Sequence, residues 1–530
     1  IYDRLVGSEM CIRDSKEVAK IAIQTPYLPG IRIDIGQTRY YPFRDLAVHL
    51  TGYVATISQS EKTGDPVLEL PGFKIGKSGI EKSFDSKMRG RGAQRQVEVN
   101  ALGRIIRKLP GEETQMGHDI ELTIDVSLQS FSTKRLAQGN SMYIPVDDPR
   151  IQRALSEGRN LPPGTDPVNG YVNVDYKGNV LAPESGAAVV MDAFNGDVLA
   201  LASTPGFDPN SFSSGLNAAD WENLLSNPRS PMTNKAVSGQ YSPGSTFKMI
   251  VCLAALEAGV AHQETKVNCS GMIEFGDSRF HCWKKDGHGW LNMIDAIEQS
   301  CDVYLYELAK RVGIKRIGEM AARFGFGEAF NFGLPGENSG LIPTPAWKRK
   351  TFGQAWHAGE TLITSIGQGF ILCTPLQLAV MTSRLVNGGR PVLPRLMKNE
   401  RAEIQKRKSL QLSPQHLHTV LKGMDKVVNG SQGTARKVVD PSMKFQFGGK
   451  SGSVQVKRIS LDERESGKLK NKDRPWRERD HAMFVAFAPL KSPRYVVSVV
   501  VEHGGGGSTM AAPIARDILA EALRLNPSKL

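Results

Sequence analysis

The chain has 530 residues, which is more than one ordinary domain holds and predicts two or three domains. Hydrophobic residues make up 40% of it and charged residues 23%, so a disordered or fibrous chain is excluded and a sizeable core is expected. The 67 basic and 54 acidic residues give a net charge of +13, which suits an anionic partner such as a membrane surface, a cell-wall polymer or nucleic acid. Nucleic acid is the least favoured of these, because no basic stripe is interleaved with aromatic residues.

The N-terminal part of the sequence is irregular. Residues 1–15 lack an initiator methionine and resemble translated adaptor sequence, so we exclude them, with Cys11, and expect a truncated N-terminus. Residues 16–117 contain short β-like runs at 95–100 and 104–107 and many glycines, which predicts a small separate domain. No window of about 20 apolar residues is present to form a transmembrane helix.

The remainder, residues 118–530, has the pattern of an α+β domain. A predicted strand at 119–125 and a helix at 127–136 open it, and an irregular insertion is expected at 140–183. Two apolar runs joined by Asn195-Gly196 predict a hairpin. We expect further strands at 444–450, 483–488 and 495–501, helices at 292–324 and 374–387, and a closing helix at 510–523. Together these predict an antiparallel sheet, formed from both ends of the domain and packed against helices.

One stretch places a hydroxyl beside an amine. Pro243 and Gly244 break the chain, and a run of helix formers, apolar nearly all round, then continues to Gly259. Ser245 is expected at the N-terminal end of this buried helix, and Lys248 on the same face. Such a pair predicts a nucleophile and its base, although a lone Ser-x-x-Lys is also typical of a capped core helix.

Two later motifs favour the catalytic interpretation. Ser300-Cys301-Asp302 lies within a helical pattern, and Lys450-Ser451-Gly452-Ser453 follows the apolar run at 444–447. The order, Ser-x-x-Lys, then Ser-x-Asn/Asp, then Lys-Ser/Thr-Gly on a late strand, is that of the penicilloyl-serine transferases.

The chain then resembles the elongation-specific class B penicillin-binding proteins, the penicillin-binding protein 2 family. Residues 79–85 and 98–104 resemble that family's pedestal (dimerisation-type) domain, residues 195–209 its approach to the nucleophile, and residues 365–370 and 374–377 its later helical region. The similarity covers the chain from about residue 16 to its end. It implies a partial pedestal at 16–117 and a transpeptidase domain at 118–530 that cross-links peptidoglycan stem peptides and is acylated by β-lactams, with carboxypeptidase activity as a side reaction.

The resemblance also implies roles for the motif residues. Oγ of Ser245 would attack the carbonyl between two D-alanines, and Lys248, made neutral by burial and by the nearby cation Lys450, would take its proton. Ser300 would relay a proton to the leaving amine. Lys450 and Ser451 would bind the terminal carboxylate.

The remaining motif residues would contact the substrate. Backbone N–H groups of Ser245 and Ser453 would form an oxyanion hole. Small residues such as Gly452 would let the substrate lie along the strand edge. Two departures from the family pattern are Asp302, where Asn is commoner, and Ser453, where Thr is commoner.

Four residues have the spacing of a metal site. Cys269-x12-Cys282-x5-His288-x12-Cys301 supplies three thiolates and an imidazole, a set suited to structural zinc, and some members of the resembled family hold zinc in the matching region. A Cys269–Cys282 disulfide is the competing interpretation, since the resembled proteins are periplasmic. Unlinked buried residues are a third, and His281 is a spare candidate ligand.

Three other functional classes fit the sequence less well than a transpeptidase. A class A β-lactamase would need a deacylating Glu-x-x-Leu-Asn after the second motif, and none occurs. An inactive scaffold would be expected to lose Lys248 or Lys450, and a β-lactam sensor domain lacks the pedestal. By resemblance, we expect a periplasmic catalytic domain on a single inner-membrane anchor missing from this chain, with a membrane glycosyltransferase of the elongation complex as partner.

Overall fold

The computed structural model describes residues 15–28, 39–69, 73–91, 97–101, 104–109, 115–145, 147–156, 171–175, 180–398, 409–457 and 471–529. The prediction of a non-native segment at residues 1–15 therefore falls outside the described residues, apart from Ser15. The chain divides into two compact units, one of residues 1–44, 51–120 and 208–218 and one of residues 45–50, 121–207 and 219–530. None of the described helices has the length and apolar character that a bilayer crossing requires.

The smaller unit consists of short helices and two-stranded sheets. Its elements are the helices α1 (Ser15–Gln24), α3 (Gly79–Ser83), α4 (Asp85–Arg89) and α7 (Asn210–Ser214), and the strands β1 (Val54–Thr56), β2 (Lys74–Gly76), β3 (Val97–Val99) and β4 (Ile105–Lys108). The antiparallel pairs are β1 with β2 and β3 with β4. The β-like runs that the sequence predicts here are confirmed as β3 and β4 over their described residues.

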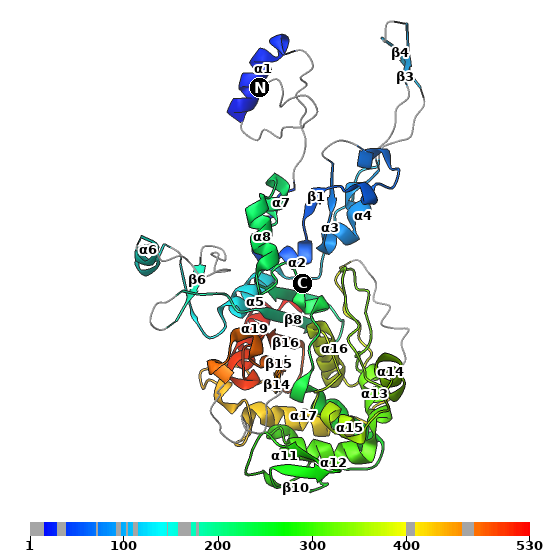
Figure 1. Ribbon diagram of the computed structural model, residues 1–530, viewed down its shortest axis with the longest axis vertical. Coiled ribbons are helices and arrows are strands. Elements are labelled where there is room, and N and C mark those ends of the chain that lie inside the picture. The colour runs from blue at the N-terminus through cyan, green and yellow to red at the C-terminus, as the bar shows by residue number, and fades with distance from the viewer. Residues whose placement is uncertain are drawn as a thin grey trace. The chain divides into compact units, whose positions relative to one another are not determined.

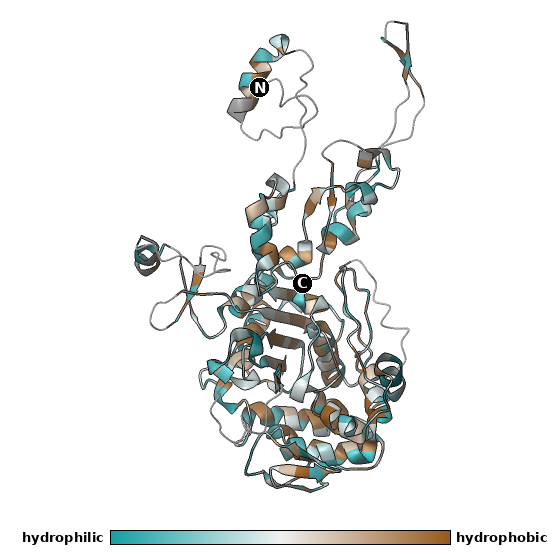
Figure 2. Ribbon diagram, viewed as in Figure 1, coloured by the Kyte–Doolittle hydropathy of each residue, from teal (hydrophilic) through white to brown (hydrophobic). Residues whose placement is uncertain are grey.

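The larger unit is built around a five-stranded antiparallel sheet in the order β14-β15-β16-β8-β9 (Figure 1). These strands are β8 (Gly186–Asp192), β9 (Val198–Thr204), β14 (Gly448–Val454), β15 (His481–Ala488) and β16 (Tyr495–Val501). The prediction that both ends of the domain contribute to one sheet is therefore confirmed. The interior strands β8 and β16 are largely apolar and are buried along their whole length, because helices cover both faces (Figure 2).

Helices form a layer on each face of this sheet. The helices α5 (Val126–Gln138) and α19 (Ala512–Leu525) pack together, with α5 also against β9 and α19 against β15 and β16. α16 (Pro375–Val386) packs against β8, β15 and β16 and is buried along its whole length. The helices predicted from the sequence at 127–136, 374–387 and 510–523 are thus confirmed. Each of their ends differs from the prediction by one or two residues.

A second group of helices lies beyond the β14 edge and carries Lys248 and Asp302 of the predicted motifs. It contains α10 (Lys248–Glu257), α11 (Met293–Glu298), α12 (Asp302–Val312), α13 (Ile314–Arg323), α14 (Pro345–Phe352), α15 (Ala358–Ser365) and α17 (Pro414–Asn429). α10 packs against α12, α13 and α17, and α17 packs against α11 and β14. The remaining described α-helices and β-strands of this unit are α2 (Val48–Thr51), α6 (Pro149–Ser156), α8 (Ala218–Ser226), α9 (Lys235–Ser238), β5 (Met142–Pro145), β6 (Tyr171–Val174), β7 (Val180–Leu181), β10 (Val267–Cys269), β11 (Met272–Phe275), β12 (Ser278–His281) and β13 (Gly289–Leu291).

Three predictions of local structure need correction. Residues 119–125 form no strand; a single bridge joins Leu122 to Met397 there. The insertion at 140–183 is not wholly irregular, because β5, β6 and β7 form a small sheet whose buried residues include Val172 and Val174. The strand predicted at 444–450 begins only at Gly448, since its pairing with β15 starts there.

The two glycines that open β14 explain why the sequence pattern missed its start. A Cβ added at Gly448 would lie 2.5 Å from the Phe487 ring, and one added at Gly449 would lie 2.6 Å from the Phe484 ring. Both aromatic rings belong to β15, so tight packing between the strands requires residues that ordinarily weaken a strand. The strand therefore extends through residues 448–454 and presents the Lys-Ser-Gly motif at the edge of the sheet.

Candidate active site

Ser245 lies in a single 3-10 turn, η6 (Gly244–Phe247), that leads directly into α10. Gly244 has a φ of 54°, and its N–H donates to O of Gly367 at 2.8 Å. Gly244, Thr246 and Phe247 are buried whereas Ser245 is partly exposed, so Ser245 is the one residue of this turn that solvent reaches. The sequence predicted a helix from Ser245 onward, and the structure delays the α-helix to Lys248.

Lys248 is the first residue of α10, and its side chain is completely buried. Its Nζ donates to O of Ser300 at 2.7 Å, to Oγ of Ser300 at 3.2 Å and to Oδ1 of Asp302 at 2.7 Å. The Ser-x-x-Lys motif and the Ser-Cys-Asp motif therefore meet through this amine. Burial raises the pKa of the Asp302 carboxyl above its usual value, while the charge of Lys248 opposes this shift.

The Ser-Cys-Asp motif occupies the sharp turn between α11 and α12. Ser300 has a φ of 54°, in the left-handed region that non-glycine residues rarely adopt. Cys301 caps the following helix, its Sγ accepting from N of Tyr304 at 3.5 Å. This turn directs the Ser300 side chain toward Lys248 and Lys450, and the Cys301 side chain toward the cysteines described below.

Lys450 approaches the same hydroxyl from β14. Its Nζ donates to Oγ of Ser300 at 2.9 Å and to O of Ser451 at 3.0 Å. Burial, followed by the charge of Lys248, lowers the pKa of Lys450 well below its ordinary value. Oγ of Ser300 thus lies within hydrogen-bond distance of two lysine amines, a geometry suited to moving a proton.

The rest of the Lys-Ser-Gly motif borders the Ser245 turn. A Cβ added at Gly452 would lie 3.2 Å from O of Pro243 and 3.3 Å from Cγ2 of Thr246, so the strand and the turn are in direct contact. Oγ of Ser451 lies 3.1 Å from Oγ1 of Thr434. Oγ of Ser453 accepts from N of Gly507 at 3.1 Å.

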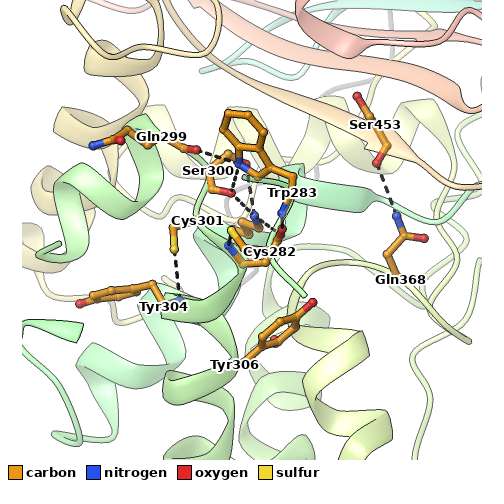
Figure 3. Close-up of polar contacts among 12 residues, drawn as sticks. Cys282, Trp283, Gln299, Ser300, Cys301, Tyr304, Tyr306, Gln368 and Ser453 are labelled. Carbon is orange, nitrogen blue, oxygen red and sulfur yellow. Dashed lines mark hydrogen bonds and ion pairs between the residues drawn. The ribbon is translucent and has the colours of Figure 1, made fainter. Parts of the chain in front are cut away.

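All three sequence motifs are therefore brought together, from η6 and α10, from the α11–α12 turn and from β14. Sequence reasoning missed Thr434, Gln368 and Trp283. Gln368 donates to O of Ser453 at 3.4 Å, and the Trp283 indole donates to O of Gln299 and O of Ser300, both at 3.1 Å (Figure 3). Gln368 lies within residues 365–370, which the sequence analysis relates only to the later helical region of the resembled family. Trp283 directly follows the predicted metal ligand Cys282, and this position is the sequence feature that could have pointed to it.

Beside the Ser300 turn, Cys269, Cys282, His288 and Cys301 form one cluster whose ligand atoms all lie within 4.8 Å of one another. Nδ1 of His288 lies 3.5 Å from Sγ of Cys269 and 3.6 Å from Sγ of Cys282. A tetrahedral zinc ion with bonds of about 2.3 Å to sulfur and about 2.0–2.1 Å to nitrogen separates such ligands by about 3.6 Å. The donor set and its spacing therefore fit a metal ion.

Two of the three thiols of the cluster are favoured as thiolates, whereas the pKa of Cys301, which donates to both of them, is raised. A hydrogen bond from Cys301 lowers the pKa of Cys269 to about 6 and that of Cys282 to about 2, which favours thiolates. The competing disulfide is not formed, because Cys269 and Cys282 are both free. His281 is not a member of the cluster. Cys252, one turn beyond Lys248 on α10, is completely buried in the core, as predicted.

The chain matches two protein-family models. Residues 186–520 match the family model of the penicillin binding protein transpeptidase domain, and residues 13–122 match that of the penicillin-binding protein dimerisation domain. The chain is 33% identical to peptidoglycan D,D-transpeptidase MrdA of Acinetobacter baumannii, over 94% of this chain and 68% of that protein. It is 31% identical to MrdA of Escherichia coli K12, over 95% of this chain and 74% of that protein.

Solved structures agree with the sequence matches. Pseudomonas aeruginosa PBP2, in a crystal structure with WCK 5153, superposes with a TM-score of 0.70 at 32% identity, covering 92% of each chain. Helicobacter pylori PBP2, in a complex with MreC, superposes with a TM-score of 0.79 at 28% identity, covering 97% of this chain and 84% of that one. A peptidoglycan synthase complex that coordinates polymerization and crosslinking contains a chain that superposes with a TM-score of 0.71 at 28% identity, over 96% of this chain and 80% of that one.

Proposed function

The chain belongs to the MrdA (PBP2) type of peptidoglycan D,D-transpeptidase, the elongation-type class B penicillin-binding proteins, and we propose that Ser245 is its acylated nucleophile. The observation that carries the proposal is the placement of Oγ of Ser300 between Nζ of Lys450, at 2.9 Å, and Nζ of Lys248, at 3.2 Å. Ser245 lies on the turn that leads into Lys248, whose backbone N–H donates to O of Ser245 and whose amine donates to the Ser300 hydroxyl.

The reaction then has two halves. In the first, Oγ of Ser245 bonds to the carbonyl carbon between the two D-alanines and gives its proton to Lys248. The amine acts here in its neutral form, whereas its protonated form is the one that pairs with Asp302 in the resting site. The proton passes through Ser300 to the nitrogen of the terminal D-alanine, whose C–N bond breaks, leaving an ester on Ser245. In the second half, an amine of another stem peptide attacks this ester, and Ser245 regains its proton. Attack by water instead would give the carboxypeptidase side reaction.

We place the substrate along the edge of β14. The terminal carboxylate lies against the hydroxyl of Ser451, with the buried amine of Lys450 behind it. Backbone N–H groups of Ser245 and Ser453 form the oxyanion hole, and Gly452 keeps the strand edge open. β-Lactams acylate Ser245 by the same route, because their ring amide replaces the scissile peptide bond.

Cross-linking can be tested directly. The purified chain, supplied with nascent uncross-linked glycan strands, is expected to produce cross-linked muropeptides. Ser245→Ala and Ser300→Ala should abolish the cross-linked product, since one removes the nucleophile and the other the relay hydroxyl. Thr351→Ala, on the exposed end of α14, is the matched hydroxyl control and should retain it. Equal cross-linking by Ser245→Ala and the intact chain would overturn the assignment.

We propose that the Cys3His cluster holds a structural zinc ion through Cys269, Cys282, Cys301 and Nδ1 of His288. When bound, zinc would supply a rigid link between the β10–β13 region and the Ser300 turn, with no part in the acyl transfer. Native mass spectrometry is expected to show one zinc per chain, lost in Cys282→Ser. Cys373→Ser, which alters a buried free cysteine outside the cluster, should keep it.

We further propose an assembly and a location from the relatives. The MreC complex and the peptidoglycan synthase complex were solved with relatives of this chain. The dimerisation-domain match at residues 13–122 supports an equivalent partner surface here. A membrane glycosyltransferase is the expected partner, and a periplasmic catalytic domain on an inner-membrane anchor the expected location. We place the boundary between the pedestal and the transpeptidase domain near residue 118. Co-purification with the glycosyltransferase, lost when residues 16–117 are deleted, tests this.

A further inference from the structure

We propose that Trp283 is a positioning residue of the acyl-transfer site: its indole N–H fixes the Ser300 peptide so that the Ser300 hydroxyl faces both lysines. The inference rests on the proposed roles of Ser300 and Lys248. It concerns a residue that none of the three motifs contains.

Trp283 contacts the motif at three points. Its Nε1–H donates to O of Gln299 and O of Ser300, each at 3.1 Å, and its backbone N–H donates to Oδ2 of Asp302 at 2.9 Å. Figure 3 shows the indole lying across the Ser300 turn, with dashed lines to Gln299 and Ser300. One residue therefore contacts both sides of Cys301, from the peptide before Ser300 to the carboxylate after it.

The Ser300 turn needs such a restraint. A φ of 54° is disfavoured for serine and persists only where surrounding contacts determine it. N of Ser300 donates to O of Ile297 at 3.2 Å, and O of Ser300 accepts from Nζ of Lys248 at 2.7 Å. Two side chains, those of Lys248 and Trp283, donate to O of Ser300. Because Lys248 is assigned to proton transfer, its hydrogen bond to this carbonyl changes during the reaction. The indole is the donor to O of Ser300 that has no chemical step to perform.

The surroundings of Trp283 favour positioning over core packing. The side chain is 58% exposed, so burial of the ring does not account for its orientation. Its ring contacts the His288 ring edge-on, with centroids 5.3 Å apart, and its backbone follows directly from Cys282. Two members of the Cys3His cluster thus hold the tryptophan from one side, and its N–H groups hold the Ser300 turn on the other.

Acylation kinetics separate this role from ligand contact. The full chain is mixed with a fluorescent penicillin in a stopped-flow instrument, and the dissociation constant of the first complex is resolved from the acylation rate constant. Two variants are compared: Trp283→Phe, and a chain with benzothienylalanine at position 283, which keeps the bicyclic ring and replaces N–H by sulfur. Trp290→Phe, a 70% exposed tryptophan on β13, is the control.

Both changes at position 283 should lower the acylation rate constant about tenfold, because each removes the indole N–H that donates to O of Gln299 and O of Ser300, and leave the dissociation constant within about twofold. Trp290→Phe should match the unmodified chain. A normal rate constant for the benzothienyl variant would overturn the inference, since ring packing would then suffice. A weakened first complex with an unchanged rate constant would overturn it too, because the ring would be a ligand contact. An unmodified chain that is never acylated would instead overturn the proposed function.

Discussion

Nζ of Lys248 lies 2.7 Å from Oδ1 of Asp302, and both side chains are withdrawn from solvent, with 0% and 11% of their surfaces exposed. The other carboxylate oxygen of Asp302 accepts the N–H of Trp283. One carboxylate therefore satisfies a buried ammonium and a backbone donor at the same time. An asparagine would offer one acceptor oxygen for these two donors.

Removing this carboxylate should be costly for stability. Asp302→Ala leaves Lys248 as an unpaired buried charge and is expected to lower the free energy of unfolding by about 3–5 kcal/mol. Asp302→Asn keeps one acceptor and should cost only about 1 kcal/mol. Urea unfolding of the three chains at neutral pH measures both values. An alanine variant as stable as the unmodified chain would show that the ion pair carries no such weight.

Gly367 sets the position of the Ser245 turn. It has a φ of 71°, and an added Cβ would lie 2.1 Å from O of Gly244, which is backbone and cannot rotate away. Gly367→Ala should therefore displace the nucleophile's turn and lower the acylation rate by a penicillin at least tenfold. Stopped-flow labelling of the variant provides the measurement.

Gly353 supplies the control for that experiment. Its φ of 68° imposes the same backbone strain on an alanine, but an added Cβ meets nothing within 4 Å. Gly353→Ala, like Gly367→Ala, should lose a small amount of stability through backbone strain, but it should retain the acylation rate. If both alanine variants were acylated equally slowly, backbone strain rather than the contact with Gly244 would be responsible.

His49 should make stability depend on acid pH. Burial, and then the charge of Lys235, lowers its pKa from 6.5 to about 4. Its imidazole is neutral in the folded chain, so the unfolded chain binds the extra proton as the pH falls below about 6.5. The free energy of unfolding is therefore highest above that pH. It falls progressively as the pH drops to about 4, by about 3 kcal/mol in all.

Urea unfolding at pH 7 and pH 5 tests this dependence. His49→Gln removes the titrating group, so its free energy of unfolding should change less between the two pH values than that of the unmodified chain. His418→Gln, on the exposed face of α17, should behave like the unmodified chain. A steeper pH dependence in His49→Gln would contradict the assignment.

The sequence allowed much of this architecture to be predicted because the signals were local. The β8–β9 hairpin followed from Asn195-Gly196 between apolar runs, and the α+β class from strands at both ends of the domain. Three short motifs in a fixed order predicted the residues that the structure gathers around Ser300. The Cys3His spacing predicted a cluster whose atoms lie within 4.8 Å of one another.

What the sequence could not show depends on tertiary contacts. The start of β14 is set by aromatic rings of β15, which no local pattern reveals. The left-handed conformation of Ser300 is held by partners distant in the sequence, such as Lys248. Trp283 resembles an ordinary surface tryptophan until its N–H is seen to face the Ser300 turn, and Thr434 becomes relevant only through its contact with Ser451.

The central claim is that Ser245 is acylated within this set of lysines and hydroxyls. Incubation with a fluorescent penicillin, followed by intact-mass analysis of the unmodified chain and of Ser245→Ala, tests it most directly. We expect a mass increase of one penicillin on the unmodified chain alone, persisting for hours because no deacylating Glu-x-x-Leu-Asn follows the second motif. An equal adduct on Ser245→Ala, or none on a folded unmodified chain, would contradict it.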